Sequence, residues 1–375
     1  SSSSSSPPSS SQNNIIMVKF RLAAVVVASR IGASTSQQVP ESLWAVGDGG
    51  TLSVCENPSS QASLDTCFSG VPKDASFYSP MTSNGIDVYH YDPDDGGSIV
   101  SCPISSLGDP NDCSPITTTD LPESPNSMAA SPDFIYLGYD VIDNTAYIYR
   151  CPLDGSSGGC VQFDDAVNRP IYSLVLANGR LYAGLGQGST SSTNNGLIWN
   201  CDPTVANSCD DFNNPGKTNV NTLAVGADYL WAGLGNGIIW RCPLDKANSC
   251  VNWYDTDKAV SSISFDAEDG TTFYAGTSGS AIGGIYTCST NGGCTLSPST
   301  DVQVESVAGG TSSVFWSLYN GPPFLYAGTS TTDVPFTSST SSNWGNTQLL
   351  YFPGSTLTTT KVKGKDNVSS SMCTL

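Results

Sequence analysis

Positive charge is scarce in this chain. Its 375 residues include 14 Lys and Arg against 33 Asp and Glu, which gives a formal net charge of −19. A surface of this sign repels a phosphate backbone, so we expect no nucleic-acid partner. Only 13% of the residues are charged, while Gly and Pro number 37 and 23. This composition favours many short strands joined by turns over long amphipathic helices, and it predicts an all-β protein.

Nitrogen ligands for metals are almost absent too. The chain has one histidine, His90, and no CxxC pair. Zinc sites in proteins are built mainly from histidine and cysteine, so neither a structural nor a catalytic zinc site is expected. The 13 cysteines are instead too many to remain free thiols in an oxidising compartment, and they indicate disulfides and an extracellular location.

A short pattern of an apolar, an aromatic, a small and a glycine-like residue recurs along the chain. Its copies are Leu43-Trp44-Ala45-Val46-Gly47, Val88-Tyr89-His90, Ile135-Tyr136-Leu137-Gly138, Leu181-Tyr182-Ala183-Gly184, Leu230-Trp231-Ala232-Gly233, Phe273-Tyr274-Ala275-Gly276 and Leu325-Tyr326-Ala327-Gly328. The aromatic positions are separated by 45, 47, 46, 49, 43 and 52 residues. This spacing is typical of β-propeller blades. We take the pattern itself to be architectural, because it occurs in every repeat.

A second strand with a cysteine follows six of these copies, and a further cysteine comes within a dozen residues. The order of the cysteines predicts the pairs Cys55/Cys67, Cys102/Cys113, Cys151/Cys160, Cys201/Cys209, Cys242/Cys250 and Cys288/Cys294. Each bridge would join the two outer strands of one blade and contribute about 2 to 4 kcal/mol. The seventh copy, Leu350-Tyr351-Phe352-Pro353, has no cysteine, and Cys373 is left as a free thiol or an intermolecular bridge.

An apolar stretch precedes the aromatic strand and supplies the innermost strand, as at 171–176, 220–225 and 260–265. We therefore predict a seven-bladed β-propeller over residues 37–362, with four-stranded blades stapled by disulfides inside each blade. It is preceded by a Ser/Pro-rich tail, 1–16, and an apolar segment, 17–36. A C-terminal tail, 363–375, follows it.

The repeats at Leu230–Arg241 and Phe273–Tyr286 resemble the Asp-box propellers of sialidase-like proteins. The Asp-box turn of that family is replaced here by the disulfide loop from Cys242 to Cys250. The chemistry of a sialidase also needs an arginine cluster, whereas this chain has only Arg21, Arg30, Arg150, Arg169, Arg180 and Arg241. The resemblance therefore implies the architecture alone, and no catalytic residue is assigned.

The segment from Met17 to Arg30 has the basic start and short apolar core of a signal peptide, so no stable membrane span is expected. If it is retained, its alternating residues are Val18, Phe20 and Leu22, followed by Val25, Val26 and Val27. These would form a strand that closes the first blade or one that is donated to a neighbouring molecule. Upstream, the Ser-rich stretch with Pro7 and Pro8 resembles the Ser-Pro segments of hydroxyproline-rich extracellular glycoproteins, which carry sugar.

Three further features suggest binding or modification. Asn367 begins the one standard N-glycosylation sequon. Asp92, Asp94 and Asp95 cluster at a turn that either holds calcium, through oxygen ligands, or is simply solvated, and no other cofactor is expected. The loop 329–345, with Trp344, is the longest departure from the repeat and is either a contact surface for a partner or sugar, or a cover for the seventh blade.

These features predict a secreted structural or interaction glycoprotein at the cell surface or in an extracellular matrix, which self-associates into an oligomer or filament. A secreted carbohydrate-binding lectin is the main alternative. A glycoside-cleaving enzyme is the third, although no acid pair can be nominated among 33 carboxylates.

Overall fold

The computed structural model describes residues 35–39, 41–47, 52–58, 79–93, 97–106, 109, 111–117, 121, 124–142, 144–153, 159–188, 195–266, 270–279, 283–300, 303–310, 313–318, 326–329, 348–352, 355–361 and 371–374. The chain divides into two compact units. The larger unit is Gln37–Leu357, and the smaller combines Ser1–Ser36 with Thr358–Leu375.

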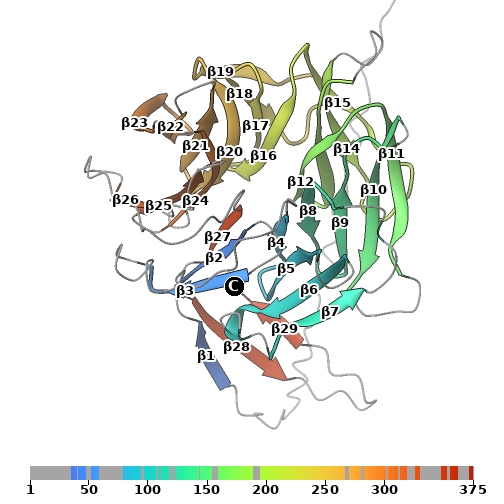
Figure 1. Cartoon of the computed structure of the whole chain (residues 1–375), viewed down its shortest axis with the longest axis vertical. Helices are drawn as coiled ribbons and strands as arrows, with labels where there is room; N and C mark the ends of the chain where they lie inside the picture. The colour runs from blue at the N-terminus through green and yellow to red at the C-terminus, as the bar shows by residue number, and fades with distance from the viewer. Residues whose placement is uncertain are drawn as a thin grey trace, which may run out of the picture. The chain divides into compact units, whose positions relative to one another are not determined.

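The larger unit is built from antiparallel sheets, and five of them have four strands in chain order (Figure 1). Their strands are β4 (Met81–Ser83), β5 (Asp87–Asp92), β6 (Ser98–Pro103) and β7 (Ser114–Thr117); β8 (Ser127–Ala130), β9 (Phe134–Gly138), β10 (Thr145–Pro152) and β11 (Val161–Val167); β12 (Ile171–Ala177), β13 (Arg180–Leu185), β14 (Gly196–Cys201) and β15 (Asp210–Gly216); β16 (Val220–Gly226), β17 (Tyr229–Leu234), β18 (Ile238–Pro243) and β19 (Val251–Asp255); and β20 (Ala259–Phe265), β21 (Thr272–Ser278), β22 (Gly283–Ser289) and β23 (Cys294–Thr300).

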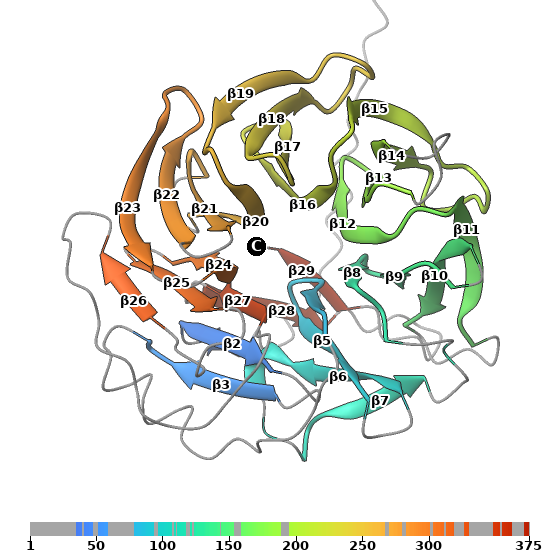
Figure 2. The ribbon, with the colours of Figure 1, turned by 45° about the horizontal axis from the view of Figure 1, so that its top comes forward.

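Two more sheets have three strands each in the described residues. One is β24 (Val304–Gly309), β25 (Ser313–Leu318) and β26 (Tyr326–Thr329); the other is β27 (Gln348–Phe352), β2 (Ser42–Val46) and β3 (Leu52–Glu56), in that order. The one helical turn in the described residues is η1 (Ile104–Ser106). The chain is therefore an all-β, seven-bladed propeller, and Figure 2 shows the sheets arranged around a central axis.

The innermost strands contact one another from sheet to sheet. The contacts run in the order β4, β8, β12, β16, β20, β24 and β27, and β27 also contacts β4. Because β27 pairs with β2, the sheet formed by the first strands of the propeller takes its inner strand from the C-terminal part of the chain.

This pairing corrects two of the sequence-based predictions. The stretch from Leu350 to Phe352 is an inner strand, not the strand that follows the seventh aromatic copy. Leu325-Tyr326-Ala327-Gly328 was predicted to be that seventh copy, but β26 is the third strand of its sheet, and the second strand, β25, carries Phe315 at the aromatic position. The inner position that the ring-closure hypothesis gave to residues 18–27 is occupied by β27, while those residues themselves lie outside the described part.

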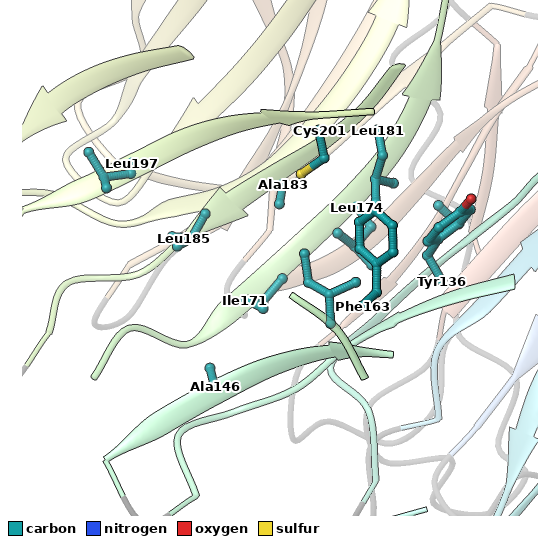
Figure 3. Packing of buried hydrophobic residues seen from close by; sticks show 12 residues of the cluster. Tyr136, Ala146, Phe163, Ile171, Leu174, Leu181, Ala183, Leu185, Leu197 and Cys201 are labelled. Carbon is teal, nitrogen blue, oxygen red and sulfur yellow. The ribbon is translucent and has the colours of Figure 1, made fainter. Parts of the chain in front are cut away.

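The hydrophobic core lies between neighbouring sheets. Figure 3 shows one such cluster, in which Tyr136 and Phe163 of one sheet pack with Leu174, Leu181 and others of the next. Equivalent clusters occupy five further seams. Each sheet is thus stable only against its neighbours, as expected for a repeat architecture.

The glycine of the repeated pattern is explained by this packing. A Cβ atom added to Gly233 would lie 2.5 Å from Cγ1 of Val260, on the inner strand of the next sheet. Gly138, Gly184 and Gly276 meet the first apolar residue of the following inner strand at 2.6 to 2.8 Å in the same way. The pattern therefore ends in glycine because a β-branched side chain of the next sheet fills that space.

A further three-stranded sheet is formed by residues near the two ends of the described chain. Its strands are β1 (Thr35–Val39), β28 (Ser355–Lys361) and β29 (Ser371–Thr374), in the order β1-β28-β29. Cys373 lies on β29 opposite Thr359 of β28. Its free or intermolecular state stays a prediction.

Candidate functional site

The two ends of the propeller differ in chemistry. Because neighbouring strands are antiparallel, the inner strand of each sheet begins at one end, and the third strand gives way to the fourth at the other. We call the end where the inner strands begin the bulge end, because those strands have β-bulges there. The other end carries the cysteines and is called the disulfide end.

Five disulfides are present in the described part of the disulfide end. They join Cys102 to Cys113, Cys151 to Cys160, Cys201 to Cys209, Cys242 to Cys250 and Cys288 to Cys294. Each links the third strand of a sheet to its fourth, as predicted. Cys55 is also disulfide-bonded, whereas its predicted partner Cys67 lies outside the described residues.

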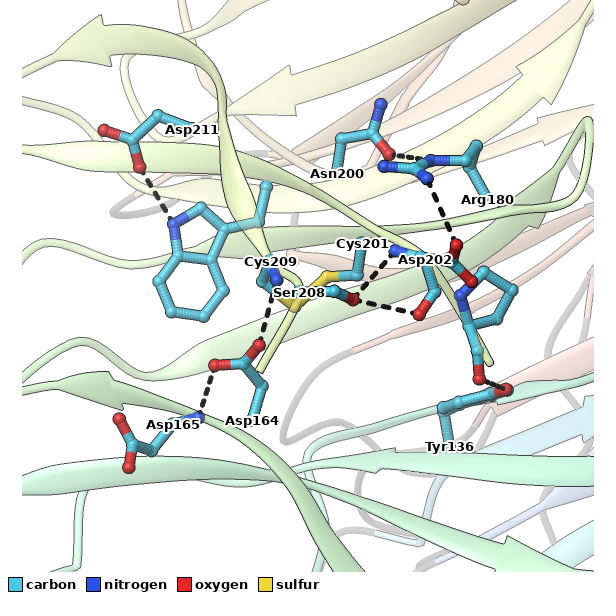
Figure 4. Close-up of a disulfide and its surroundings, with 12 residues drawn as sticks. Tyr136, Asp164, Asp165, Arg180, Asn200, Cys201, Asp202, Ser208, Cys209 and Asp211 are labelled. Atoms are coloured by element: carbon cyan, nitrogen blue, oxygen red, sulfur yellow. Dashed lines mark hydrogen bonds and ion pairs between the residues drawn. A yellow bond between two sulfur atoms is a disulfide. The ribbon is translucent and has the colours of Figure 1, made fainter. Parts of the chain in front are cut away.

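Two of the repeated tyrosines tie their sheet to the disulfide loop of the next. The Tyr136 hydroxyl donates to the Pro203 carbonyl oxygen at 2.7 Å (Figure 4). The Tyr182 hydroxyl donates to the Leu244 carbonyl oxygen at 2.9 Å. Burial raises the pKa of both phenols, so they stay protonated donors. These aromatic residues are therefore architectural, as the sequence predicted.

The disulfide loops also bond to the outer strand of the preceding sheet. Asn207 and Asn248 have positive φ angles of 55° and 56°, a conformation that asparagine tolerates. Their backbone N–H groups donate to the carbonyl oxygens of Phe163 and Phe212 at 2.9 and 2.8 Å. The Asp164 carboxylate accepts the Cys209 N–H at 3.0 Å.

Three of the arginines belong to the same network. Arg150 donates through Nη1 to the Pro203 and Thr204 carbonyl oxygens, and Arg241 donates to that of Thr290 at 3.3 Å. Arg180 donates through Nε to the Asn200 side chain at 2.6 Å. None of the three is presented to a ligand as a carboxylate clamp would require.

Exposed large apolar side chains are found only at the disulfide end in the part of the propeller that is described. They are Ile86, Val161, Val205, Val251 and Leu296, each between 47% and 52% exposed. One belongs to each four-stranded sheet, either in the turn between its first two strands, in its disulfide loop, or near the start of its outer strand. This end therefore repeats one aliphatic side chain per sheet.

The bulge end is polar. The inner strands share a break in register against the second strand, which leaves Tyr172, Asn221, Ser261 and Glu305 as bulged residues. A hydroxyl residue follows each of them: Ser173, Thr222, Ser262 and Ser306. Asn126 and Ser127 occupy the same two positions in β8, since Asn126 N–H donates to the Gly138 carbonyl and Ser127 pairs with Gly138.

At several seams these side chains bond the next inner strand. Asn221 Nδ2 donates to the Val260 carbonyl at 2.9 Å, and Ser261 Oγ donates to that of Val304 at 2.6 Å. Ser173 and Ser262 accept through Oγ the N–H groups of Leu223 and Val307. The bulged residues and the hydroxyl residues that follow them thus form hydrogen bonds with backbone C=O and N–H groups of the next inner strand.

The seam between β8 and β12 departs from this rule. Asn126 Nδ2 and Ser127 Oγ are buried, and neither has a hydrogen-bond partner. Arg169 Nε, two residues before Ile171 in the next inner strand, is also buried without a partner. Such groups are rare in folded proteins because each costs about 1 to 3 kcal/mol when left unmade.

His90 stands at a position where several other sheets have alanine. Its pairing with Met81 places it at the position of Ala183 and Ala232. Its ring is 5% exposed, and Nδ1 has no hydrogen-bond partner. Burial lowers the pKa of His90 below the ordinary 6.5, against the opposing effect of the Asp92 carboxylate.

The remaining predicted site residues are outside the described part. They are the tail prolines Pro7 and Pro8, the segment 18–27, the carboxylates Asp94 and Asp95, Trp344 and the sequon at Asn367. Asp92 is described, and no group of three or more metal-ligating residues is found in the part of the chain that the structure describes. Calcium binding at Asp92, Asp94 and Asp95 therefore stays a prediction.

Sequence reasoning did not single out Asn126, Ser127 or Arg169. A signal was present, because Ser127, Ser173, Thr222 and Ser306 each stand nine residues before the aromatic residue of the next strand. The residue type repeats, but the missing bonds at one seam are visible only in three dimensions.

Comparisons with known proteins show the fold alone. No family model and no curated protein sequence matches the chain. Among solved structures, a protein from Lactobacillus plantarum matches with a TM-score of 0.58 at 14% identity, covering 84% of this chain and 99% of that one. The Mitotic Checkpoint Complex matches with 0.49 at 12%, covering 76% and 82%. The WD40 β-propeller domain of Doa1 matches with 0.44 at 11%, covering 66% and 77%, and we draw nothing from these last two.

In the residues that the structure describes, no helix has the length and apolar character needed to cross a bilayer.

Proposed function

We propose that this protein is an extracellular interaction module that associates with further copies of itself through its disulfide end. The observation that carries the proposal is the single exposed aliphatic side chain in each of the five four-stranded sheets at that end. Together these side chains present one small apolar contact from each of the five sheets, although not from equivalent positions. Association would bury these side chains and remove apolar surface from water.

The disulfides support an oxidising compartment. Bridges of this kind are rare where glutathione keeps thiols reduced, and five are present in the described sheets. We further propose that the protein is a glycoprotein of the cell surface or matrix, with sugar on Asn367 and on the Ser/Pro tail.

The likeness to Asp-box propellers belongs to the same proposal. The disulfide loop in this chain lies where an Asp-box turn would follow the third strand, and it bonds the preceding sheet through Asn207 and Asn248. We propose that the bridge took over the structural role of that turn. No activity is carried over with it.

The test compares the secreted protein with a variant in which Val161, Val205 and Val251 are each changed to Ser. We expect oligomers or filaments from the unchanged protein, by light scattering and electron microscopy, and smaller species from the variant at the same concentration. A matched variant with Asp140, Asn214 and Asn236 changed to Ser controls for surface substitution as such, and it should assemble normally.

Two outcomes would overturn the proposal. If the triple valine variant assembles as well as its control, the disulfide end is not the surface of association. If the unchanged protein is monomeric and binds sugars on a glycan array, the lectin hypothesis takes its place. A truncation that begins at Gln37 tests the separate hypothesis that residues 17–36 are a donated strand, because its loss of assembly with intact folding would support donation.

A further inference from the structure

The buried groups at the seam between β8 and β12 have a common chemistry. Asn126 Nδ2 can only donate hydrogen bonds, Arg169 Nε can only donate, and Ser127 Oγ can donate or accept. Each of the three groups can donate a hydrogen bond and lacks an acceptor oxygen to receive it. Because a guanidinium is always charged, the acceptor that fits it best is an anion.

Asn126 and Ser127 lie just before and at the start of β8, and Arg169 lies two residues before the start of β12, the inner strand that contacts β8. Asn126 and Ser127 lie against Gly138, through the Asn126 N–H bond of 2.7 Å and the pairing of Ser127. Ser127 Oγ and Ile171 Cγ2 are each 2.6 Å from the point where a Gly138 Cβ would lie. The hydroxyl therefore points into the seam beside Ile171, and Arg169 is two residues upstream of it.

The seams from β12 to β24 differ from this one. The equivalent amide of Asn221 and the equivalent hydroxyls of Ser173 and Ser262 all have protein partners. Ser127 is 7% exposed, so bulk water does not satisfy it. Among the described arginines, Arg150, Arg180 and Arg241 have side-chain bonds to protein oxygens at the disulfide end.

We propose that this seam is a binding site for a carboxylate group, held by Arg169 and Asn126 with Ser127 as a third hydrogen-bond donor. A carboxylate has two planar acceptor oxygens, which suits a guanidinium with one free N–H and a nearby amide. The group would come from a sugar acid or from an acidic side chain. This site is at the bulge end and does not depend on the association proposed above.

The test uses the full-length secreted protein and calorimetric titration. The probes are D-glucuronate and a glutamate blocked at both termini, and D-glucose serves as the uncharged control. We expect saturable binding of at least one carboxylate and none of glucose. Binding of glucuronate alone would identify a sugar acid as the source, and binding of both would identify the carboxylate itself.

Three variants locate the site. Arg169→Gln should weaken binding at least tenfold, Arg169→Lys should weaken it less because the charge remains, and Asn126→Ala should weaken it several-fold. Asn221→Ala is the matched control, since it removes the same amide from a seam where that amide already has a partner. It should leave the affinity unchanged, and circular dichroism should show all variants folded.

The proposal fails if neither carboxylate binds saturably to the unchanged protein. It also fails if Asn221→Ala weakens binding as much as Asn126→Ala does, because the effect would then be a general loosening of inner strands. A high-resolution crystal structure grown with glucuronate that shows only water against Arg169 and Ser127 would overturn it as well.

Discussion

The space between the second strand of a sheet and the inner strand of the next is filled in opposite ways in two regions, the sheets from β12 to β23 and the sheet from β4 to β7. In the first group, a glycine at the end of the second strand admits a β-branched residue of the next inner strand, as Gly184 admits Val220. In β5 the glycine position is held by Tyr91, which packs with Met128 and Leu137 of the following sheet. Pro125, just before the inner strand β8 of that sheet, stands where β12, β16, β20 and β24 have isoleucine or valine.

The comparison teaches that the repeat conserves the filled volume and not the residue. A large side chain has moved from the inner strand of one sheet to the second strand of the sheet before it. Interiors packed at the density of organic crystals tolerate such exchanges when the total volume is kept. The copy at Val88-Tyr89-His90 therefore departs from the repeated pattern, although Tyr91 still fills the seam to the next sheet.

Replacing Tyr91 with Gly is expected to have the largest effect. This restores the residue of the regular sheets without the β-branched partner, and it leaves a cavity where a side chain only 6% exposed had been. Large-to-small changes of this kind cost about 3 to 5 kcal/mol. Urea unfolding with the disulfides intact measures the loss.

Tyr91→Phe is the control, and it should cost much less because the ring remains. A Tyr91→Gly variant as stable as the unchanged protein would show that Tyr91 does not fill the seam, and the contrast between the two regions would be lost.

Replacing Gly233 with Ala is expected to be the next largest change. The new methyl group would lie 2.5 Å from Val260 Cγ1 and 2.6 Å from Thr222 Cγ2, closer than real atoms pack. Overpacking of this type costs about 1 to 3 kcal/mol. The same unfolding measurement applies.

A second substitution makes this test specific. Val260→Ala in the Gly233→Ala background should recover part of the lost stability, although Val260→Ala alone destabilises. Simple additivity of the two losses would mean that the glycine is required by something other than the close approach of Val260.

Much of this fold was predictable because repetition amplifies weak signals. The blade spacing and the order of the cysteines predicted the sheets and the five bridges that the structure describes. The seventh copy was misplaced because Tyr326 resembles the aromatic pattern, although it stands 52 residues after Tyr274, whereas Phe315 stands only 41 after it. Strand order across the ends of the chain depends on contacts far apart in sequence, and a local pattern contains no information about them.

The candidate sites were less predictable for a physical reason. Asn126 has the same residue type as Asn221, and only the partner atoms distinguish a bonded amide from an unbonded one. The aliphatic residues of the disulfide end are single valines, leucines and isoleucines in polar loops, where sequence alone does not show that they share one end.

The smallest expected effect concerns His90, which lies on the second strand of the irregular sheet. Its pKa is lowered by burial, so in the folded protein the ring stays neutral at a pH where the unfolded chain already binds a proton. Stability from this residue is therefore present above pH 6.5 and is lost as the pH falls from 6.5 toward the folded pKa. The slope is at most about 1.4 kcal/mol per pH unit.

His90→Leu isolates this contribution, since Leu137 occupies the same position in the next sheet and cannot titrate. The carboxylates titrate alike in both proteins, so the difference between their unfolding free energies reports on His90, the only histidine of the chain. We expect the two curves of stability against pH to diverge below pH 6.5, with the unchanged protein losing more. Parallel curves from pH 7.5 to 5 would mean that the ring is hydrated or hydrogen-bonded in solution, and the irregular seam would then be more open than its packing implies.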